Sequence, residues 1–212
     1  MPARAKICGL STPETLAAAV AGGASHLGFV FFPPSPRHLA PERAAALIRH
    51  APDQVGKVGV FVDPDDALLD EAVAAGLTAI QLHGSEPPAR AAELRARHGL
   101  DVWKAVPVRT RADLALARAY HGAATRILYD AKPPAGSALP GGVGLRFDWR
   151  LLDGFAHPLP WVLSGGLDAG NVGAAIGIIG ARLVDVSSGV EAAPGVKDVD
   201  KIAAFLQAVA AS

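Results

Sequence analysis

The chain has 212 residues, half of them hydrophobic, and its 20 basic and 20 acidic residues give a formal net charge of zero. That length can bury a sizeable core and suits one domain, residues 1–212, better than two. Without an excess of either charge, nothing in the composition favours binding to nucleic acid or to a membrane surface. No stretch approaches the roughly 20 apolar residues of a membrane span.

The cysteine content and the N-terminal residues indicate in which cellular compartment the protein is expected. A single cysteine, Cys8, cannot form an intramolecular disulfide, which is typical of proteins from a reducing compartment. Residues 1–6 are basic, but no apolar segment with a cleavage site follows them, as a secretory signal requires. We therefore expect a cytoplasmic protein.

Short β-branched or aromatic runs alternate along the chain with longer alanine-rich runs of helical period. The expected strands are, in order, residues 5–9, 26–31, 57–62, 79–82, 102–106, 126–130, 161–163 and 182–186. The expected helices lie between them and after the last: from Ser11 or Thr12 to Gly22, from near Pro41, from Asp63-Pro64 to Gly76, after Glu86 to about His98, from a Thr110 cap, around 149–154, over 171–178 and from about Val199.

This order amounts to eight βα units, spaced about 25 residues apart, as expected of a parallel sheet. Eight units favour closure into a single-domain α/β protein, a (β/α)8 TIM barrel, over an open doubly wound sheet. The open sheet is further disfavoured because no G-x-G-x-x-G fingerprint follows the first strand.

Polar residues follow the predicted strands at the end where barrel enzymes place their active sites. They are Cys8 after the first strand, Arg37 in the Pro-rich loop after the second, His83 after the fourth, Asp130 at the sixth, Gly165-Gly166 after the seventh, and Asp185 with Ser188-Gly189 at the eighth. If the barrel closes, these residues converge on one mouth, which packing alone hardly explains.

Each candidate also has a structural interpretation. Cys8 is either a buried small hydrophobe or a general base, which requires some thiolate. Asp130 is either a solvated aspartate or helix cap, or an acid that keeps its proton beside apolar residues. Arg37 is either a surface residue or, held by a stiff loop, a partner for a carboxylate of the substrate.

The two glycine loops are individually weak signals. Glycine allows backbone N–H groups to approach an anion, and in this fold the loops after strands seven and eight often bind phosphate. His83 is either a base or a structural hydrogen-bond partner, and Asp185 either contacts substrate or orients its neighbours. Lys104 is expected to be structural. No set of residues is spaced as metal ligands, so we expect no metal and no cofactor.

Taken in order, these segments resemble the phosphoribosylanthranilate isomerase family. The matching stretches are Lys6-Ile7-Cys8-Gly9, residues 28–31 with Ser35-Pro36-Arg37, residues 58–62, Gln81-Leu82-His83-Gly84, Asp130, residues 141–144 with Phe147-Asp148-Trp149, Gly165-Gly166-Leu167, and residues 185–191 with 194–198. Any one is weakly specific, but the ordered set spans the chain and is highly specific.

The resemblance implies a cofactor-free Amadori rearrangement of N-(5-phosphoribosyl)anthranilate in tryptophan biosynthesis. By analogy with the family, Asp130 is the general acid and Cys8 the general base. Arg37 binds the anthranilate carboxylate, and Gly165, Gly166, Ser188 and Gly189 bind the phosphate. Asp185 lies near the sugar, and His83 is counted with the substrate-binding residues. The expected partner is a small phosphorylated substrate, and both a monomer and a homodimer are open.

Two positions depart from the family pattern. Val143 replaces a threonine of the glycine loop, and Asp168 stands where the loop after strand seven usually has asparagine.

Another phosphosugar barrel, such as a pentose-phosphate epimerase, explains the phosphate loops but not Cys8 with Asp130 and Arg37. A silent ligand-binding barrel is disfavoured because acid and base are both present.

Overall fold

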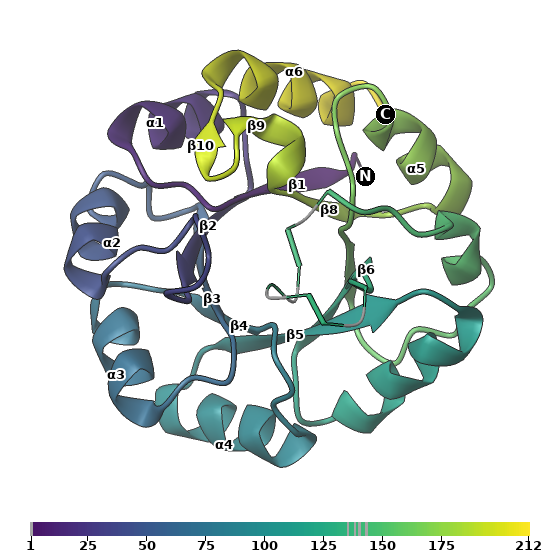
Figure 1. Cartoon of the computed structure of the whole chain (residues 1–212), viewed down its shortest axis with the longest axis horizontal. Coiled ribbons are helices and arrows are strands. Elements are labelled where there is room, and N and C mark those ends of the chain that lie inside the picture. Colours follow the sequence, from purple (N-terminus) through teal and green to yellow (C-terminus); the bar gives the residue numbers. More distant parts are fainter. Residues whose placement is uncertain (1, 135, 138, 140, 143) are drawn as a thin grey trace.

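Eight parallel strands close into a barrel in chain order, and helices surround it (Figure 1). The computed structural model describes residues 2–134, 136–137, 139, 141–142 and 144–212. The predicted (β/α)8 TIM barrel is therefore confirmed. No helix in the described part of the chain is both long and apolar enough to span a membrane.

The barrel strands match the predicted ones closely, and three of them match at both ends. They are β1 (Arg4–Cys8), β2 (His26–Phe31), β3 (Gly56–Phe61), β4 (Ala79–Leu82), β5 (Asp101–Val108), β6 (Arg126–Ala131), β7 (Trp161–Leu163) and β8 (Leu183–Val186). A short antiparallel hairpin, β9 (Glu191–Ala193) with β10 (Val196–Lys197), follows β8 and was not predicted.

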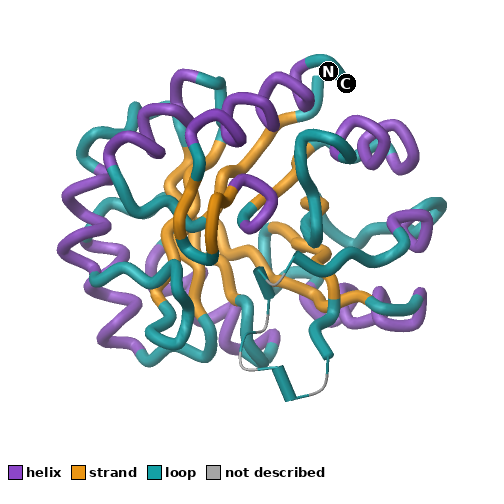
Figure 2. The backbone as a smooth tube through the Cα atoms, turned by 45° about the horizontal axis from the view of Figure 1, so that its top comes forward, coloured by secondary structure: helices purple, strands orange, loops and turns teal. Residues whose placement is uncertain are grey.

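Helices connect the strands on the outside of the barrel, as the tube in Figure 2 shows. The α-helices are α1 (Pro13–Ala21), α2 (Pro41–Ile48), α3 (Asp66–Ala74), α4 (Pro88–His98), α5 (Val172–Ile179) and α6 (Val199–Ala210), and the 3-10 helices are η1 (Arg111–Tyr120), η2 (Trp149–Leu152) and η3 (Ser188–Val190).

Local capping explains where the helices begin. Thr12 caps α1 through its side chain, as predicted. The expectation that Asp63-Pro64 opens α3 was wrong by two residues, because the Asp65 carboxylate accepts the hydrogen bond from the Leu68 N–H and fixes the start. Thr110 caps the next helix as predicted, but that helix is 3-10 rather than α.

The core has an outer and an inner part, as in other barrels of this kind. The outer part packs the strands against the helices and includes Ile7, Phe29, Leu94 and Phe205. Inside the barrel, a second cluster fills the axis: Val58, Ala79, Trp103, Ala105, Leu128, Val162 and Leu183. The barrel interior is therefore a packed core along these residues rather than a pore.

Candidate active site

A pocket with about 790 Å³ of empty space, open solvent at its mouth included, lies at the carboxyl ends of the barrel strands. The predicted residues that line it are Cys8, Arg37, His83, Asp130, Gly165, Gly166, Asp185 and Ser188. Gly189 is not among the lining residues. The prediction that these strand ends converge is thus confirmed for all but that residue.

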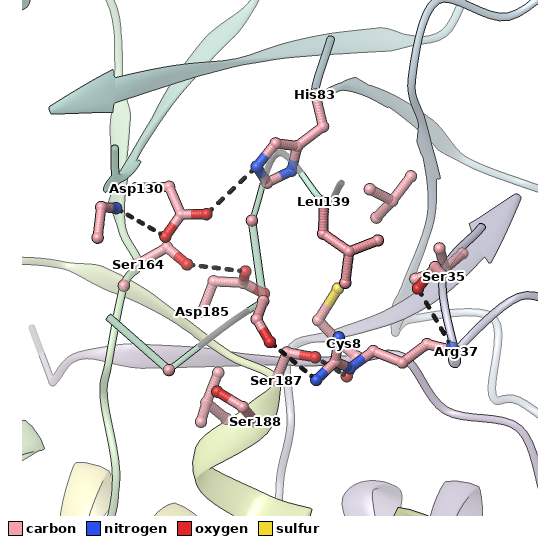
Figure 3. Close-up of a pocket in the computed structure, with 18 of the residues that line it drawn as sticks. Cys8, Ser35, Arg37, His83, Asp130, Leu139, Ser164, Asp185, Ser187 and Ser188 are labelled. Atoms are coloured by element: carbon pink, nitrogen blue, oxygen red, sulfur yellow. Dashed lines mark hydrogen bonds and ion pairs between the residues drawn. The ribbon is translucent and has the colours of Figure 1, made fainter. Parts of the chain in front are cut away.

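Cys8 ends β1, with only 6% of its surface exposed, and its sulfur points into the pocket (Figure 3). Cys8 pairs with Gly28 on the neighbouring strand β2, and its sulfur fills the space that a side chain at position 28 would need. Burial raises the pKa of the Cys8 thiol, while the positive charges of Lys6 and Lys197 act in the opposite direction and Asp185 adds to the rise. The cysteine is accordingly a buried thiol with cations beside it.

Asp130 lies near the end of β6 and is buried. Its Oδ1 accepts a hydrogen bond from the N–H of Ala131 at 2.9 Å, and its Oδ2 lies 3.2 Å from Nε2 of His83. These contacts fix the carboxyl group at the pocket wall (Figure 3). On its other side, the Nδ1 of His83 lies 3.2 Å from the Nε2 of Gln81. Gln81, His83 and Asp130 therefore form a continuous chain of polar groups.

Gln81 was not singled out from the sequence as a separate candidate. Its side chain on β4 is buried and lines the pocket, and its Oε1 finds no hydrogen-bond partner within the described ranges. A buried unpaired polar atom costs free energy, so such an atom at a pocket wall suits contact with a ligand.

Asp185 lies on β8 and is held from two sides. Its Oδ1 accepts a hydrogen bond from the Nζ of Lys6 at 2.8 Å, and its Oδ2 accepts one from the Ser164 hydroxyl at 3.3 Å. Lys6 and Asp185 are neighbours in the parallel pairing of β1 with β8, so the ion pair follows from the register of the barrel. Asp185 both lines the pocket and orients its neighbours.

Arg37 is buried at the edge of the pocket, but its contacts differ from the expectation. The guanidinium donates from Nε and Nη2 to the two carboxylate oxygens of Glu191, at 2.7 and 2.8 Å, and from Nη2 to the carbonyl of Gly142 at 2.9 Å. The two guanidinium N–H groups that were expected to bind a substrate carboxylate are thus already paired with Glu191 of the protein itself. The remaining nitrogen, Nη1, lies near Gly142.

The two glycine loops have backbones that side chains would disturb. Gly165 and Gly166 have φ angles of +89° and +65°, which favour glycine. A Cβ on Gly165 would lie 2.7 Å from the N of Ala131, and one on Gly189 would lie 1.9 Å from the carbonyl oxygen of Leu167. The loops after β7 and β8 therefore pack backbone against backbone at the pocket.

Asp168, which departs from the family pattern, has a structural role. Its Oδ1 accepts a hydrogen bond from the N–H of Gly170 at 2.8 Å, and its own N–H donates to Asn171 at 3.0 Å. Asn171 donates to the carbonyl of Gly166 at 3.0 Å and so supports the glycine loop. The other departure, Val143, lies outside the described residues.

Three charged residues near the site were missed as candidates: Lys6, Glu191 and Lys197. Lys197 donates to Glu191 at 2.6 Å and to the carbonyl and hydroxyl of Ser187. Lys6 could have been found, because residues i and i+2 of a strand share a face and Lys6 therefore points where Cys8 points. Glu191 and Lys197 gave no such signal, since their strands are too short for periodicity.

Lys104, expected to be structural, pairs with Glu86 at 2.6 Å and donates to the carbonyl of Gly84. Among the residues that the structure describes, no group of three or more His, Cys, Asp or Glu side chains is arranged to hold a metal ion. The chemistry available at the pocket is that of a thiol, carboxylates, a guanidinium and backbone N–H groups.

A closed (β/α)8 barrel with a buried thiol, a carboxyl group and glycine loops at one mouth defines the class of barrel enzymes that act on small molecules. The family model for N-(5'phosphoribosyl)anthranilate (PRA) isomerase matches residues 5–208. The chain belongs to this family.

Relatives and solved structures agree with that assignment. The N-(5'-phosphoribosyl)anthranilate isomerase of Zymomonas mobilis subsp. pomaceae is 58% identical over 210 residues, which are 99% of each chain. The crystal structure of phosphoribosyl anthranilate isomerase from Thermotoga maritima is 39% identical, with a TM-score of 0.86 over 99% of this chain and 100% of that one.

A third comparison concerns a bound ligand. A phosphoribosyl anthranilate isomerase in complex with reduced 1-(o-carboxyphenylamino)-1-deoxyribulose 5-phosphate is 37% identical, with a TM-score of 0.86 over 99% of this chain and 100% of that chain.

Proposed function

We propose that this protein isomerises N-(5'-phosphoribosyl)anthranilate to 1-(o-carboxyphenylamino)-1-deoxyribulose 5-phosphate, a step of tryptophan biosynthesis. The observation that carries the proposal is the meeting of a thiol, Cys8, and a carboxyl group, Asp130, in one pocket from strands β1 and β6. An aldose–ketose rearrangement needs one acid and one base around a bound sugar, and no electrons are gained or lost overall.

Asp130 acts as the general acid in this proposal. It protonates the furanose ring oxygen, the C1–O bond breaks, and the nitrogen lone pair forms the C=N bond of a Schiff base. The buried carboxyl group is held by the N–H of Ala131 and by His83, which aim its Oδ2 along the pocket wall. An acid that must donate to one atom benefits from such fixed geometry.

Cys8 acts as the general base. Its thiolate removes the proton from C2, the C–H electrons form the C1=C2 bond, and the C1=N electron pair returns to nitrogen. The resulting enolamine becomes the ketone when C1 takes up a proton and the C2 hydroxyl gives one up. The sulfur reaches the pocket from β1, whereas Asp130 reaches it from β6. The two groups thus have separate positions for two successive proton transfers.

The remaining residues bind the substrate in this proposal. The Nη1 group of Arg37 and the amide of Gln81 contact the anthranilate half or the sugar hydroxyls, and Asp185 lies at the sugar. The glycine loops after β7 and β8, with Gly165, Gly166 and Ser188 at the pocket, hold the phosphate through backbone N–H groups. Gly189 supports that site by packing against the loop after β7.

A fluorescence assay tests the proposal. Phosphoribosylanthranilate is generated in situ from anthranilate and phosphoribosyl pyrophosphate by its transferase, and its loss is followed after this protein is added. We expect loss far above the spontaneous rate for the wild type, a collapse for Asp130→Asn, and wild-type loss for the control Asp153→Asn, at an exposed position. Loss no faster than the spontaneous rate in the wild type would refute the isomerase proposal.

A further inference from the structure

Lys6 is a lysine with no exposed surface, and it points into the barrel interior beneath the pocket. It precedes Cys8 by two residues on β1, so both side chains leave the same face of the strand. Burying an ammonium group without compensation is costly, and lysine is therefore almost never fully buried unless it is paired. The role of this residue is not explained by packing.

The side chains of Lys6 and Cys8 meet beside Gly28 on the neighbouring strand. A Cβ on Gly28 would lie 2.9 Å from the Cys8 sulfur and 3.1 Å from Cε of Lys6, so both groups occupy the space that this glycine leaves open. The Lys6 ammonium, which has three donors, donates a hydrogen bond to Asp185 and lies beside the Cys8 sulfur. Its charge therefore acts on the sulfur as well as on the carboxylate.

Charged side chains face Cys8 from three strands. Lys6 faces it from β1, Asp185 from β8 and Lys197 from β10. Lys197 and Arg37 share Glu191, and both lie against Gly9, the residue after Cys8. Three buried basic side chains thus lie around Cys8 together with the carboxylates of Asp185 and Glu191. Asp130 and His83 face the same pocket as a pair of their own.

We propose that Lys6 is a positioning residue for the base, and that its buried ammonium group stabilises the thiolate of Cys8. The catalytic meaning of this interaction rests on the proposed function of Cys8, but the interaction itself is measurable without turnover. Lys6 touches neither substrate nor reacting atoms in this account. It acts through the sulfur.

The titration behaviour of both groups agrees with this arrangement. Burial opposes a charge on Lys6, but Asp185 and Cys8 outweigh it and raise the pKa of the lysine to about 12, so it stays charged at neutral pH. Burial raises the pKa of Cys8, and Lys6 is the largest influence that lowers it. Removing the Lys6 charge therefore leaves the thiol harder to ionise.

Alkylation of the thiol tests the proposal. Cys8 is the only cysteine in the chain, so every iodoacetamide adduct found by mass spectrometry reports on it. The alkylation rate is measured against pH for the wild type, for Lys6→Met and for Lys57→Met. Lys57 is likewise a buried lysine of a barrel strand, but its ammonium lies 3.9 Å from Asp53 rather than beside Cys8, which makes it the matched control.

We expect the alkylation midpoint of Lys6→Met to move up by about one to three pH units, the usual effect of one nearby charge, and that of Lys57→Met to stay in place. Asp185→Asn should move the midpoint down, because it removes the carboxylate that competes for Lys6. If Lys6→Met does not fold, Lys6→Gln, which keeps a polar side chain but removes the charge, decides in its place by the same upward shift of the midpoint. Profiles of folded variants that coincide with the wild type would overturn the proposal.

The same experiment separates this proposal from the proposed function. Shifted midpoints together with a wild type that shows no isomerase turnover support the Lys6–Cys8 interaction and reject the isomerase. Normal wild-type turnover with unshifted midpoints supports the isomerase and rejects the role of Lys6.

Discussion

Arg37 donates two parallel hydrogen bonds to Glu191, at 2.7 and 2.8 Å, from the loop after β2 to the first residue of the β9–β10 hairpin. The same carboxylate accepts a hydrogen bond from Lys197 at 2.6 Å. Glu191 thus holds two cations at the pocket edge, and burial opposes its charge while Arg37 and Lys197 outweigh that effect and lower its pKa. The direction in which Arg37 faces the pocket is set by this hairpin.

Replacing Glu191 by glutamine should both destabilise the protein and weaken ligand binding. Breaking a buried ion pair from one side typically costs about 3–5 kcal/mol, because a charge is left without its partner. Urea unfolding measures the stability, and calorimetry with reduced 1-(o-carboxyphenylamino)-1-deoxyribulose 5-phosphate measures the affinity, which should fall about 10-fold or more. Unchanged affinity in a folded variant would show that Glu191 does not position Arg37.

The glycine loop after β8 should not tolerate a side chain at Gly189. A Cβ there would lie 1.9 Å from the carbonyl oxygen of Leu167, so one backbone segment must move. We expect Gly189→Ala to lose about 1–3 kcal/mol of unfolding free energy and to weaken binding of inorganic phosphate.

Gly177 provides the control for that substitution. It lies exposed in α5, and a Cβ there would meet nothing within 4 Å. Gly177→Ala should therefore gain about 0.5–1 kcal/mol, the usual advantage of alanine in a helix. A Gly189→Ala variant as stable as the wild type would contradict the packing argument.

His83 should affect the chemical step more than ligand binding. Its Nε2 lies 3.2 Å from Oδ2 of Asp130, and its Nδ1 lies 3.2 Å from Nε2 of Gln81. His83→Ala frees the carboxyl group of Asp130, so kcat should fall about 10- to 100-fold with little change in KM. Steady-state kinetics distinguishes an effect on the chemical step from an effect on binding. A rise in KM at constant kcat would contradict the prediction and make His83 a substrate-binding residue.

The stability of the fold should fall as the pH drops below neutral. Burial lowers the pKa of His26 and His157 to about 4 each, and Arg126 adds to the effect on His26. Between pH 6.5 and 4 the unfolded chain therefore binds protons that the native protein does not, and the unfolding free energy decreases. His26→Gln/His157→Gln should show a shallower decrease in urea titrations.

A control for the histidine prediction is His50→Gln, at an exposed position. A double variant with the same pH dependence as the wild type would show that other groups control acid stability.

Much of the fold follows from local patterns in the sequence. Strands β2, β4 and β7 were predicted at both ends, because each is a short, mostly apolar run with a polar residue or a proline within two positions of either end. The start of α3 was misplaced because Asp63 and Asp65 are both plausible caps, and only the hydrogen bond of Asp65 distinguishes them. Alternation of strands and helices was enough to predict closure.

The site was less predictable, because its contacts join distant segments. The rule that barrel sites lie at strand ends found Cys8, Asp130 and Asp185. It could not show that Glu191 occupies the guanidinium fork of Arg37, since the two lie 154 residues apart and the hairpin strands have only three and two residues. Such pairings depend on three-dimensional packing that no local pattern encodes.

The central claim is that Cys8 removes the C2 proton, and Cys8→Ser tests it most directly. A hydroxyl is nearly the same size as a thiol but a far weaker acid, so it offers almost no anionic base. The account predicts that turnover of phosphoribosylanthranilate falls at least about 1,000-fold, within the usual contribution of a general base. Affinity for the reduced product stays within about threefold. Turnover of Cys8→Ser equal to that of the wild type would contradict the account.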